Sequence, residues 1–147
     1  MSEPPSGLVI EDAHPARTLD EASLRALLEH VIAEENARVH FLGVILTDHD
    51  TVRHLNREHL GHDYNTDVLS FPLSEPDAEA PVVDGEIYVD LDTAAERHDE
   101  FDTTFEREAF RYAVHGVLHL LGYDDASDAE RTAMREAEDR YLHTVSA

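Results

Sequence analysis

The sequence predicts a single α+β domain, in which a mixed four-stranded sheet is packed with about five helices. Four short segments are rich in β-branched or alternating apolar residues, which is typical of strands. Five others repeat apolar residues every three or four positions, which is typical of amphipathic helices. The two kinds are interleaved along 147 residues, a length that suits one hydrophobic core. We therefore expect residues 1–147 to form one domain, with residues 1–7 flexible.

The first half of the chain contains two expected strands and two expected helices. They are, in order, a strand over 8–11, a helix from Thr18 or Asp20 to about Asn36, a strand over 38–47 and a helix from Asp48 or Asp50 to about Leu60. The apolar stripe of the first helix comprises Leu24, Leu27, Leu28, Val31 and Ile32. In the second strand, the residues expected to face the core are Val39, Phe41, Val44 and Ile45. Gly61 ends the second helix.

The second half adds two strands and three helices. They are a strand over 67–71, a strand over 85–91, a helix from Asp92 or Thr93 toward Phe101, a long helix over 105–121 and a helix from Ser127 to about His143. Pro72 closes the third strand, and an acidic loop over 74–84 follows it. Gly122 stops the long helix. Ser127 and Glu130 have the spacing of a capping box, which predicts where the last helix begins.

The chain is strongly acidic. Aspartate and glutamate number 33, the 11 basic residues are all arginine, and the net charge is -22. In dilute buffer this charge repels nucleic acid, whose binding draws on cationic contacts to phosphate. The acids are dispersed along the chain, so a well-solvated surface accounts for them. Adaptation to a concentrated-salt cytoplasm is the sharper hypothesis.

Other features of the composition limit the class of protein. There is no cysteine, so disulfides and thiolate metal sites are excluded, and any metal is held by His, Asp or Glu. The longest apolar runs, such as 41–46, are far shorter than the ~20 residues of a membrane-spanning helix. Residues 1–7 lack the basic and apolar blocks of a signal peptide. We expect no membrane partner and a cytoplasmic location.

Two histidines four residues apart, His115 and His119, lie in the long expected helix. At this spacing their side chains project from the same face, with Cβ atoms about 5–6 Å apart, so both imidazoles can bind one ion. After Gly122 the chain can return a carboxylate to the open side of that ion. The candidates for this third ligand are Asp124, Asp125 and Asp128. Two histidines and a carboxylate leave a fourth zinc position for water, as in catalytic rather than structural sites.

A second interpretation of the histidine pair stays open at this point. The surrounding helix is apolar on most sides, so it is expected to be buried, and two hydrogen-bonded core histidines fit the same pattern. The pair also differs from the metalloprotease signature His-Glu-x-x-His, because Gly116 stands where that signature has its glutamate base. A peptidase is therefore the less favoured hydrolase. Gly116 is expected to permit close helix packing or the approach of substrate.

Several segments together resemble the YbeY family, bacterial rRNA maturation factors regarded as metal-dependent endoribonucleases. They are His-Gly-Val-Leu-His-Leu-Leu-Gly-Tyr-Asp at 115–124, Leu-Asn at 55–56 followed by Thr-Asp-Val-Leu-Ser-Phe-Pro at 66–72, and Gly-Glu-Ile-Tyr-Val at 85–89. The stretch Met-Arg-Glu-x-Glu at 134–138 is similar to the C-terminal helix of the family. The resemblance covers most of the chain between residues 40 and 142.

The chain departs from the family pattern at two positions. The family has His-x3-His-x5-His, and its third histidine falls on Asp125 here. Carboxylate oxygen binds zinc at about 2.0–2.2 Å, close to the distance for imidazole, so the resemblance implies His115, His119 and Asp125 as metal ligands. The family arginine that follows Leu-Asn-x-x-x falls on Leu60. Arg57, one helical turn earlier, is the candidate to replace it.

The resemblance implies a single-strand-specific endoribonuclease that matures the end of the small-subunit rRNA with one Zn²⁺ ion. A zinc-bound water would attack the phosphodiester bond, and Arg57 or Arg111 would neutralise charge on the phosphoryl oxygens. Asp67 is expected to act as general base or, preferably, as the hydrogen-bond acceptor for a ligand imidazole. The implied partners are single-stranded rRNA and small ribosomal subunit proteins, with no DNA expected.

Two other functions remain as alternatives. One is a non-catalytic ribosome-assembly factor with a structural metal, which the leucine at position 60 and the acidic composition both support. It predicts co-sedimentation with pre-ribosomes without turnover. The other is a zinc hydrolase of another substrate, such as a peptidase, which predicts cleavage of peptides and not of RNA.

The acidic composition predicts that the folded state is more stable in concentrated salt. At 1 M salt the Debye length falls to about 3 Å, so repulsion between surface carboxylates largely disappears. We expect thermal melts followed by circular dichroism to give a lower Tm in about 0.1 M than in about 2 M sodium chloride. An equal Tm at the two concentrations contradicts salt adaptation.

Overall fold

The structure, a computed structural model, describes residues 7–60, 68–73, 81–123 and 127–144. The strands within these ranges are β1 (Leu8–Asp12), β2 (Arg38–Thr47), β3 (Val68–Pro72) and β4 (Val82–Asp90). The helices are α1 (Glu21–Glu34), α2 (His49–Leu60), α3 (Leu91–Arg97), the 3₁₀ helix η1 (His98–Phe101), α4 (Phe105–Leu120) and α5 (Asp128–Leu142). The predicted α+β class and the order of the elements are confirmed. The expected flexible segment over 1–7 lies, except for Gly7, outside the described residues.

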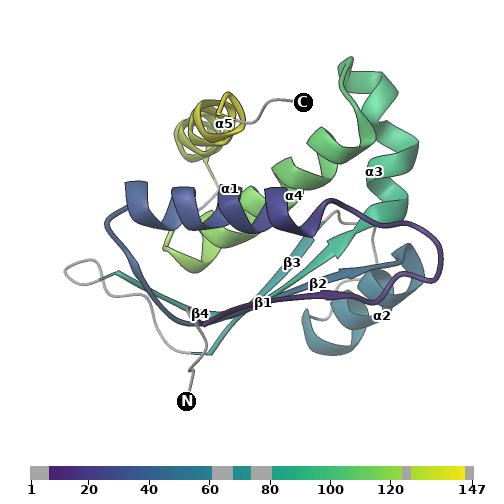
Figure 1. Ribbon diagram of the computed structural model, residues 1–147, viewed down its shortest axis with the longest axis horizontal. Coiled ribbons are helices and arrows are strands. Elements are labelled where there is room, and N and C mark those ends of the chain that lie inside the picture. The colour runs from purple at the N-terminus through teal and green to yellow at the C-terminus, as the bar shows by residue number, and fades with distance from the viewer. Residues whose placement is uncertain (1–6, 61–67, 74–80, 124–126, 145–147) are drawn as a thin grey trace.

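The four strands form one mixed sheet, as predicted, and their order in the sheet is β1-β2-β4-β3. β1 and β4 both run parallel to β2, whereas β3 pairs antiparallel with β4. Figure 1 shows α1, α4 and α5 on one side of the sheet and α2 on the other. α4 packs on β3 and β4, and α5 packs on α4 and α1. The helix that carries the two histidines is therefore fixed between the sheet and the last helix.

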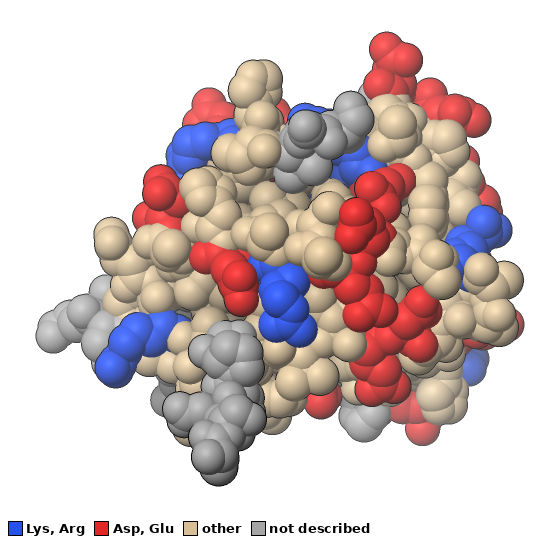
Figure 2. Space-filling model, viewed as in Figure 1, with Lys and Arg blue, Asp and Glu red and all other residues tan. Residues whose placement is uncertain are grey.

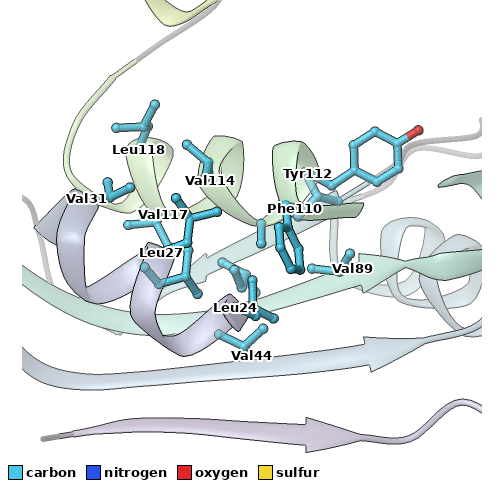
Figure 3. Close-up of a cluster of buried hydrophobic side chains, with 14 of the residues drawn as sticks. Leu24, Leu27, Val31, Val44, Val89, Phe110, Tyr112, Val114, Val117 and Leu118 are labelled. Atoms are coloured by element: carbon cyan, nitrogen blue, oxygen red, sulfur yellow. The ribbon is translucent and has the colours of Figure 1, made fainter. Parts of the chain in front are cut away.

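The hydrophobic core lies between the sheet and the helices α1 and α4. All five residues of the predicted α1 stripe are buried. Figure 3 shows three of them, Leu24, Leu27 and Val31, close to side chains of α4 and the central strands. The other labelled residues are Val44, Val89, Phe110, Tyr112, Val114, Val117 and Leu118. Burying a side chain of this size stabilises the fold by about 1.5–3 kcal/mol. This core sets the position of α4 relative to the sheet.

The face of β2 that packs on the core differs from the prediction. Leu42, Val44 and Leu46 are fully buried, while Phe41 and Ile45 are only partly buried. The pairing register with β4 shifts between Val39 and Phe41, which marks a β-bulge. An extra residue in one strand moves every later side chain to the other face of the sheet. The prediction was therefore right for Val39 and Val44, on either side of the bulge, and wrong for Phe41 and Ile45.

One strand boundary and one helix end also differ from the prediction. β4 begins at Val82 rather than at residue 85, because Val82 and Val83 pair with the start of β2. α1 ends at Glu34, and Asn36 adopts φ 58° just beyond it. Asparagine tolerates this left-handed conformation better than most residues. The chain therefore turns into β2 slightly earlier than the apolar pattern indicates.

The predicted helix from Asp92 or Thr93 to Phe101 is divided in two. It starts at Leu91 because Asp90, at the end of β4, is the N-cap and accepts a hydrogen bond from Thr93 N–H at 2.8 Å. After Arg97 it tightens into η1, which ends at Asp102 with φ 54°. The resulting turn leads directly into α4.

The surface in Figure 2 shows a broad band of aspartate and glutamate, with arginine scattered between other residues. Clustered carboxylates repel one another, and dissolved salt screens that repulsion. Among the described residues, no helix is both long enough and apolar enough to cross a membrane.

The Asp92 carboxylate, in the first turn of α3, joins three segments beyond the ends of β1, β2 and β4. It accepts hydrogen bonds from the His49 backbone N–H at 3.0 Å, from His14 Nε2 at 2.8 Å and from Arg17 Nε at 3.0 Å. Burial by itself raises the pKa of Asp92, but these hydrogen bonds outweigh it and hold the pKa at about 2. Folding therefore favours the ionised form of Asp92.

We predict that Asp92→Asn lowers the free energy of unfolding at pH 7 by roughly 1 kcal/mol, since the side chain is partly exposed. A carboxyl with a lowered folded-state pKa stabilises the fold above its unfolded pKa of about 3.9, and this contribution disappears as the pH falls toward 2. Urea unfolding across this pH range should show the difference between wild type and variant shrinking below pH ~4. Glu29→Gln, at an exposed position of α1, is the charge-matched control. If the free energies of unfolding of wild type and Asp92→Asn differ by the same amount at every pH, the lowered pKa of Asp92 is contradicted.

Candidate metal centre

α4 presents one partly exposed stripe, and the two histidines lie on it. The helix begins after Thr104, whose side chain accepts a hydrogen bond from the Arg107 N–H at 3.1 Å. Most of its residues are buried against the sheet and neighbouring helices. Arg107, Arg111, His115 and His119 are all only partly buried, and a spacing of four residues places them along one side of the helix. We call these four residues the α4 stripe.

The two imidazoles lie against each other as their spacing predicts. Their ring centroids are 4.6 Å apart and the ring planes are inclined at 76°. The His115 side chain is 25% exposed. The helix is buried on most sides, as expected, but not along the α4 stripe, so the histidine pair is accessible from solvent.

The end of α4 determines the orientation of His119. Gly122 adopts φ 105°, and the N–H groups of Gly122 and Tyr123 donate to the carbonyls of His119 and Leu118 at 3.0 Å each. This is a Schellman ending, which needs a positive φ and therefore favours glycine. The turn brings the Tyr123 carbonyl to 3.1 Å from His119 Nδ1, which donates to it. The predicted helix stop thus also fixes one imidazole.

His115 is oriented from the last helix, α5. Its Nδ1 lies 2.6 Å from Oε2 of Glu138, a side chain that is only 6% exposed. The other oxygen of Glu138 accepts from Arg111 at 2.9 Å, and Arg111 also donates to Asp139 at 2.7 Å. Burial lowers the pKa of Arg111, but its hydrogen bonds to Asp139 and Glu138 outweigh this effect and raise the pKa. The guanidinium therefore stays charged and fixes the Glu138 carboxylate.

The proton positions on both imidazoles suit metal binding. A carbonyl oxygen and a carboxylate only accept hydrogen bonds, so Nδ1 of each histidine carries the proton. In the neutral ring, Nε2 then has the lone pair that a metal ion binds. Metal-binding histidines commonly donate their other N–H to a carboxylate or a carbonyl in this way. The pair therefore fits a divalent ion such as zinc.

Tyr123 is held at both its carbonyl and its hydroxyl. The hydroxyl donates to both carboxylate oxygens of Glu35 at 3.1 Å, and the Tyr141 hydroxyl donates to Glu35 as well. Burial, followed by the hydrogen bond to Glu35, raises the pKa of Tyr141 to about 12. Tyr141 therefore remains a donor at neutral pH. Through Tyr123, the end of α1 helps to fix His119.

α4 approaches the sheet closely beside the histidines. Ser70 Oγ donates to the Gly116 carbonyl at 3.1 Å. A Cβ atom at position 116 would lie 3.0 Å from Ile87 Cγ2 and 3.2 Å from Val68 Cγ2, so any larger residue would push the helix away. Of the two roles expected for Gly116, the structure supports close helix packing.

The remaining predicted site residues have different outcomes. Asp125 and Asp67 lie outside the described residues, so their roles as third ligand and as base or acceptor stay predictions. The hydrogen-bond acceptor at His115 Nδ1 is Glu138, and the acceptor at His119 Nδ1 is the Tyr123 carbonyl. Arg57 is exposed on α2, which packs on β3, β4 and α3, and its catalytic role also stays a prediction. Arg111 lies beside the histidines and is bound to Glu138 and Asp139, and its role in neutralising phosphoryl charge stays a prediction.

Within the described ranges, no three His, Asp or Glu side chains are arranged to hold a metal ion. The pair of histidines is therefore the described part of the predicted site, and completion by a third ligand depends on residues beyond those ranges. Sequence reasoning missed Glu138 and Glu35. Glu138 is 23 residues from His115 in the chain, and no local spacing links them. The one available signal was that Glu138 lies in the segment that resembles the family's C-terminal helix.

These features define a small α+β domain with a histidine pair whose hydrogen bonding fits a metal ion. A family model described as Endoribonuclease YbeY matches residues 9–146. A protein of Salinibacter ruber named Endoribonuclease YbeY is 57% identical, with 97% of this chain and 94% of the relative covered. A protein of the same name from Chlorobium phaeovibrioides is 45% identical, with 89% and 86% covered.

A solved structure agrees with these sequences. The solution structure of TM1509 from Thermotoga maritima has a TM-score of 0.63 and 34% identity, and the match covers 92% of this chain and 87% of that one. The chain belongs to the YbeY family, and the resemblance noted in its motifs is confirmed.

We predict that Glu138→Gln weakens zinc binding by roughly 10–100-fold, the usual effect of losing a hydrogen-bond partner of a ligand histidine. The amide removes the negative charge and can turn its N–H₂ group toward His115, so the ring is no longer held in one tautomer. Zinc affinity is measured by competition with a chromogenic chelator. Glu136→Gln, an exposed neighbour on α5, is the matched control. Equal zinc affinities of the two variants contradict the role of Glu138.

Proposed function

We propose that this protein is a single-strand-specific endoribonuclease that matures rRNA at the end of the small-subunit rRNA. The observation that carries the proposal is the pair His115 and His119 with both Nδ1 protons fixed, in a chain of the YbeY family. The curated relatives are named endoribonucleases. We also propose that the cofactor is one zinc ion, bound by His115, His119 and Asp125.

Each described residue of the site has a separate task in this reaction. A zinc ion held by His115, His119 and Asp125 would lower the pKa of a bound water toward 7 and would polarise the scissile phosphate. Glu138 and the Tyr123 carbonyl keep the Nδ1 protons in place, so that Nε2 of each ring keeps the lone pair that would bind the ion. Arg111 fixes Glu138, and its positive charge lies one helical turn from His115.

The arginine that the family has at the position of Leu60 is the part of the machinery that this chain lacks. Arg57, exposed on α2, is proposed to supply the missing positive charge to the phosphoryl oxygens. Asp67 is proposed as the base that accepts a proton from the attacking water, because the acceptor positions at both Nδ1 atoms are filled.

A ribosome-assembly factor without turnover is the second candidate. The observation that favours it is that the Arg111 guanidinium is already bound by Glu138 and Asp139. Under either candidate, we propose single-stranded rRNA and small ribosomal subunit proteins as partners and a cytoplasm of high salt as the location. The acidic surface supports the last point.

We predict that His115→Ala abolishes both zinc binding and RNA cleavage, because one imidazole and a carboxylate hold zinc weakly. The assay uses a labelled single-stranded RNA in about 1 M salt, where carboxylate repulsion is screened. His143→Ala, beyond the end of α5, is the control. Cleavage by a metal-free His115 variant refutes the mechanism. Wild-type protein that co-sediments with pre-ribosomes and never cleaves RNA supports the assembly factor, and cleavage of peptides alone supports a different hydrolase.

A further inference from the structure

A cavity of about 290 Å³ lies between the turn that precedes α4, the first half of α4 and α5. Its lining consists of Asp102, Thr103, Arg107, Glu108, Arg111 and Arg135. Three of the 11 basic residues of the chain thus meet in one cavity of a protein whose net charge is -22. Two carboxylates line the same cavity, so it offers both cationic N–H donors and carboxylate acceptors to a ligand.

The three arginines differ in their present contacts. Arg111 is bound to Glu138 and Asp139. Among the described residues, the guanidinium groups of Arg107 and Arg135 have no hydrogen-bond or ion-pair partner, although Arg107 is partly buried. A guanidinium group carries five N–H donors that match the oxygens of a phosphate. The donors of Arg107 and Arg135 are thus available to a ligand in the cavity.

The cavity also contains groups that suit the sugar rather than the phosphate of a nucleotide. Thr103 Oγ1 is a buried atom without a hydrogen-bond partner within the described ranges. Glu108 is 4% exposed, and its side chain has no described partner. Two carboxylates, Asp102 and Glu108, weaken the attraction for a simple anion. A ligand with both phosphate oxygens and hydroxyl donors satisfies the two kinds of group together.

The cavity adjoins the histidine pair along α4. Arg107 and Arg111 belong to the α4 stripe, and four residues of helix correspond to a rise of about 6 Å. Arg111 is therefore one turn from His115, and it joins both sites because it contacts Glu138, the acceptor of His115. A single strand of RNA that reaches the histidines and continues along the α4 stripe would therefore enter the cavity.

We infer that this cavity is a second subsite for single-stranded RNA, which binds a nucleotide that flanks the cleaved bond. This inference rests on the proposed function. Arg107 and Arg135 bind the phosphate, while Glu108 and Thr103 bind ribose hydroxyls. Because the 2′-hydroxyl distinguishes RNA from DNA at a binding site, the carboxylate and hydroxyl give the subsite a preference for RNA. The local arginines replace the long-range attraction that the acidic surface does not provide.

The test measures binding separately from cleavage. Fluorescence anisotropy with a labelled single-stranded RNA of about ten nucleotides is recorded on metal-free protein in EDTA, at the lowest salt that keeps the protein folded. We expect Arg107→Glu and Arg135→Glu each to weaken binding about tenfold or more and to reduce the salt dependence by the equivalent of about one phosphate contact. Thr103→Val should reduce the ratio of RNA affinity to DNA affinity for the same base sequence.

Arg38→Glu is the matched control, since it makes the same charge change at an exposed position at the start of β2, which does not line the cavity. Thermal melts check folding, and Arg107→Ala and Arg135→Ala serve as milder variants. Equal RNA affinities of the Arg107, Arg135 and Arg38 variants overturn the subsite. Cleavage with zinc separates the two hypotheses: a wild type that never cleaves RNA refutes the proposed function, whereas a wild type that cleaves with a KM unchanged by Arg107→Glu refutes only the subsite.

Discussion

The position of one proton on each of two imidazoles is the constraint on which the site depends. Nδ1 of His115 is held by a buried carboxylate and Nδ1 of His119 by a backbone carbonyl. Different parts of the fold supply these acceptors. The first comes from α5, packed over α4, and the second from the turn that ends α4 itself. The core between α1, α4 and the sheet therefore keeps both hydrogen-bond acceptors, Glu138 and the Tyr123 carbonyl, in position beside the histidines.

The parts of the fold that the sequence predicts are those encoded by neighbouring residues. The α1 stripe, the capping box at Ser127 and the stop at Gly122 each depend on spacings of a few positions, and the structure confirms them. The face of β2 after Val39 was not predictable in this way, because a bulge depends on pairing with β4. The break after Arg97 likewise depends on the tertiary packing of the following turn.

The same distinction applies to the site. The histidine pair follows from an interval of four residues on one helix. Glu138 and Glu35 reach the site through tertiary packing alone, from helices at opposite ends of the chain. The cavity between α4 and α5 is likewise formed by tertiary packing. Its arginines come from two helices, and their meeting could not be read from a composition in which acids outnumber bases.

The location of Glu138 on the last helix has a consequence for synthesis of the protein. A growing polypeptide emerges with α4 complete before α5 exists, so His115 at that stage has no carboxylate to hold its ring. The two-histidine arrangement is thus assembled only after translation has passed residue 138 and α5 has docked. An endoribonuclease of this fold therefore acquires its hydrogen-bonded histidine pair only after nearly all of its chain has been synthesised.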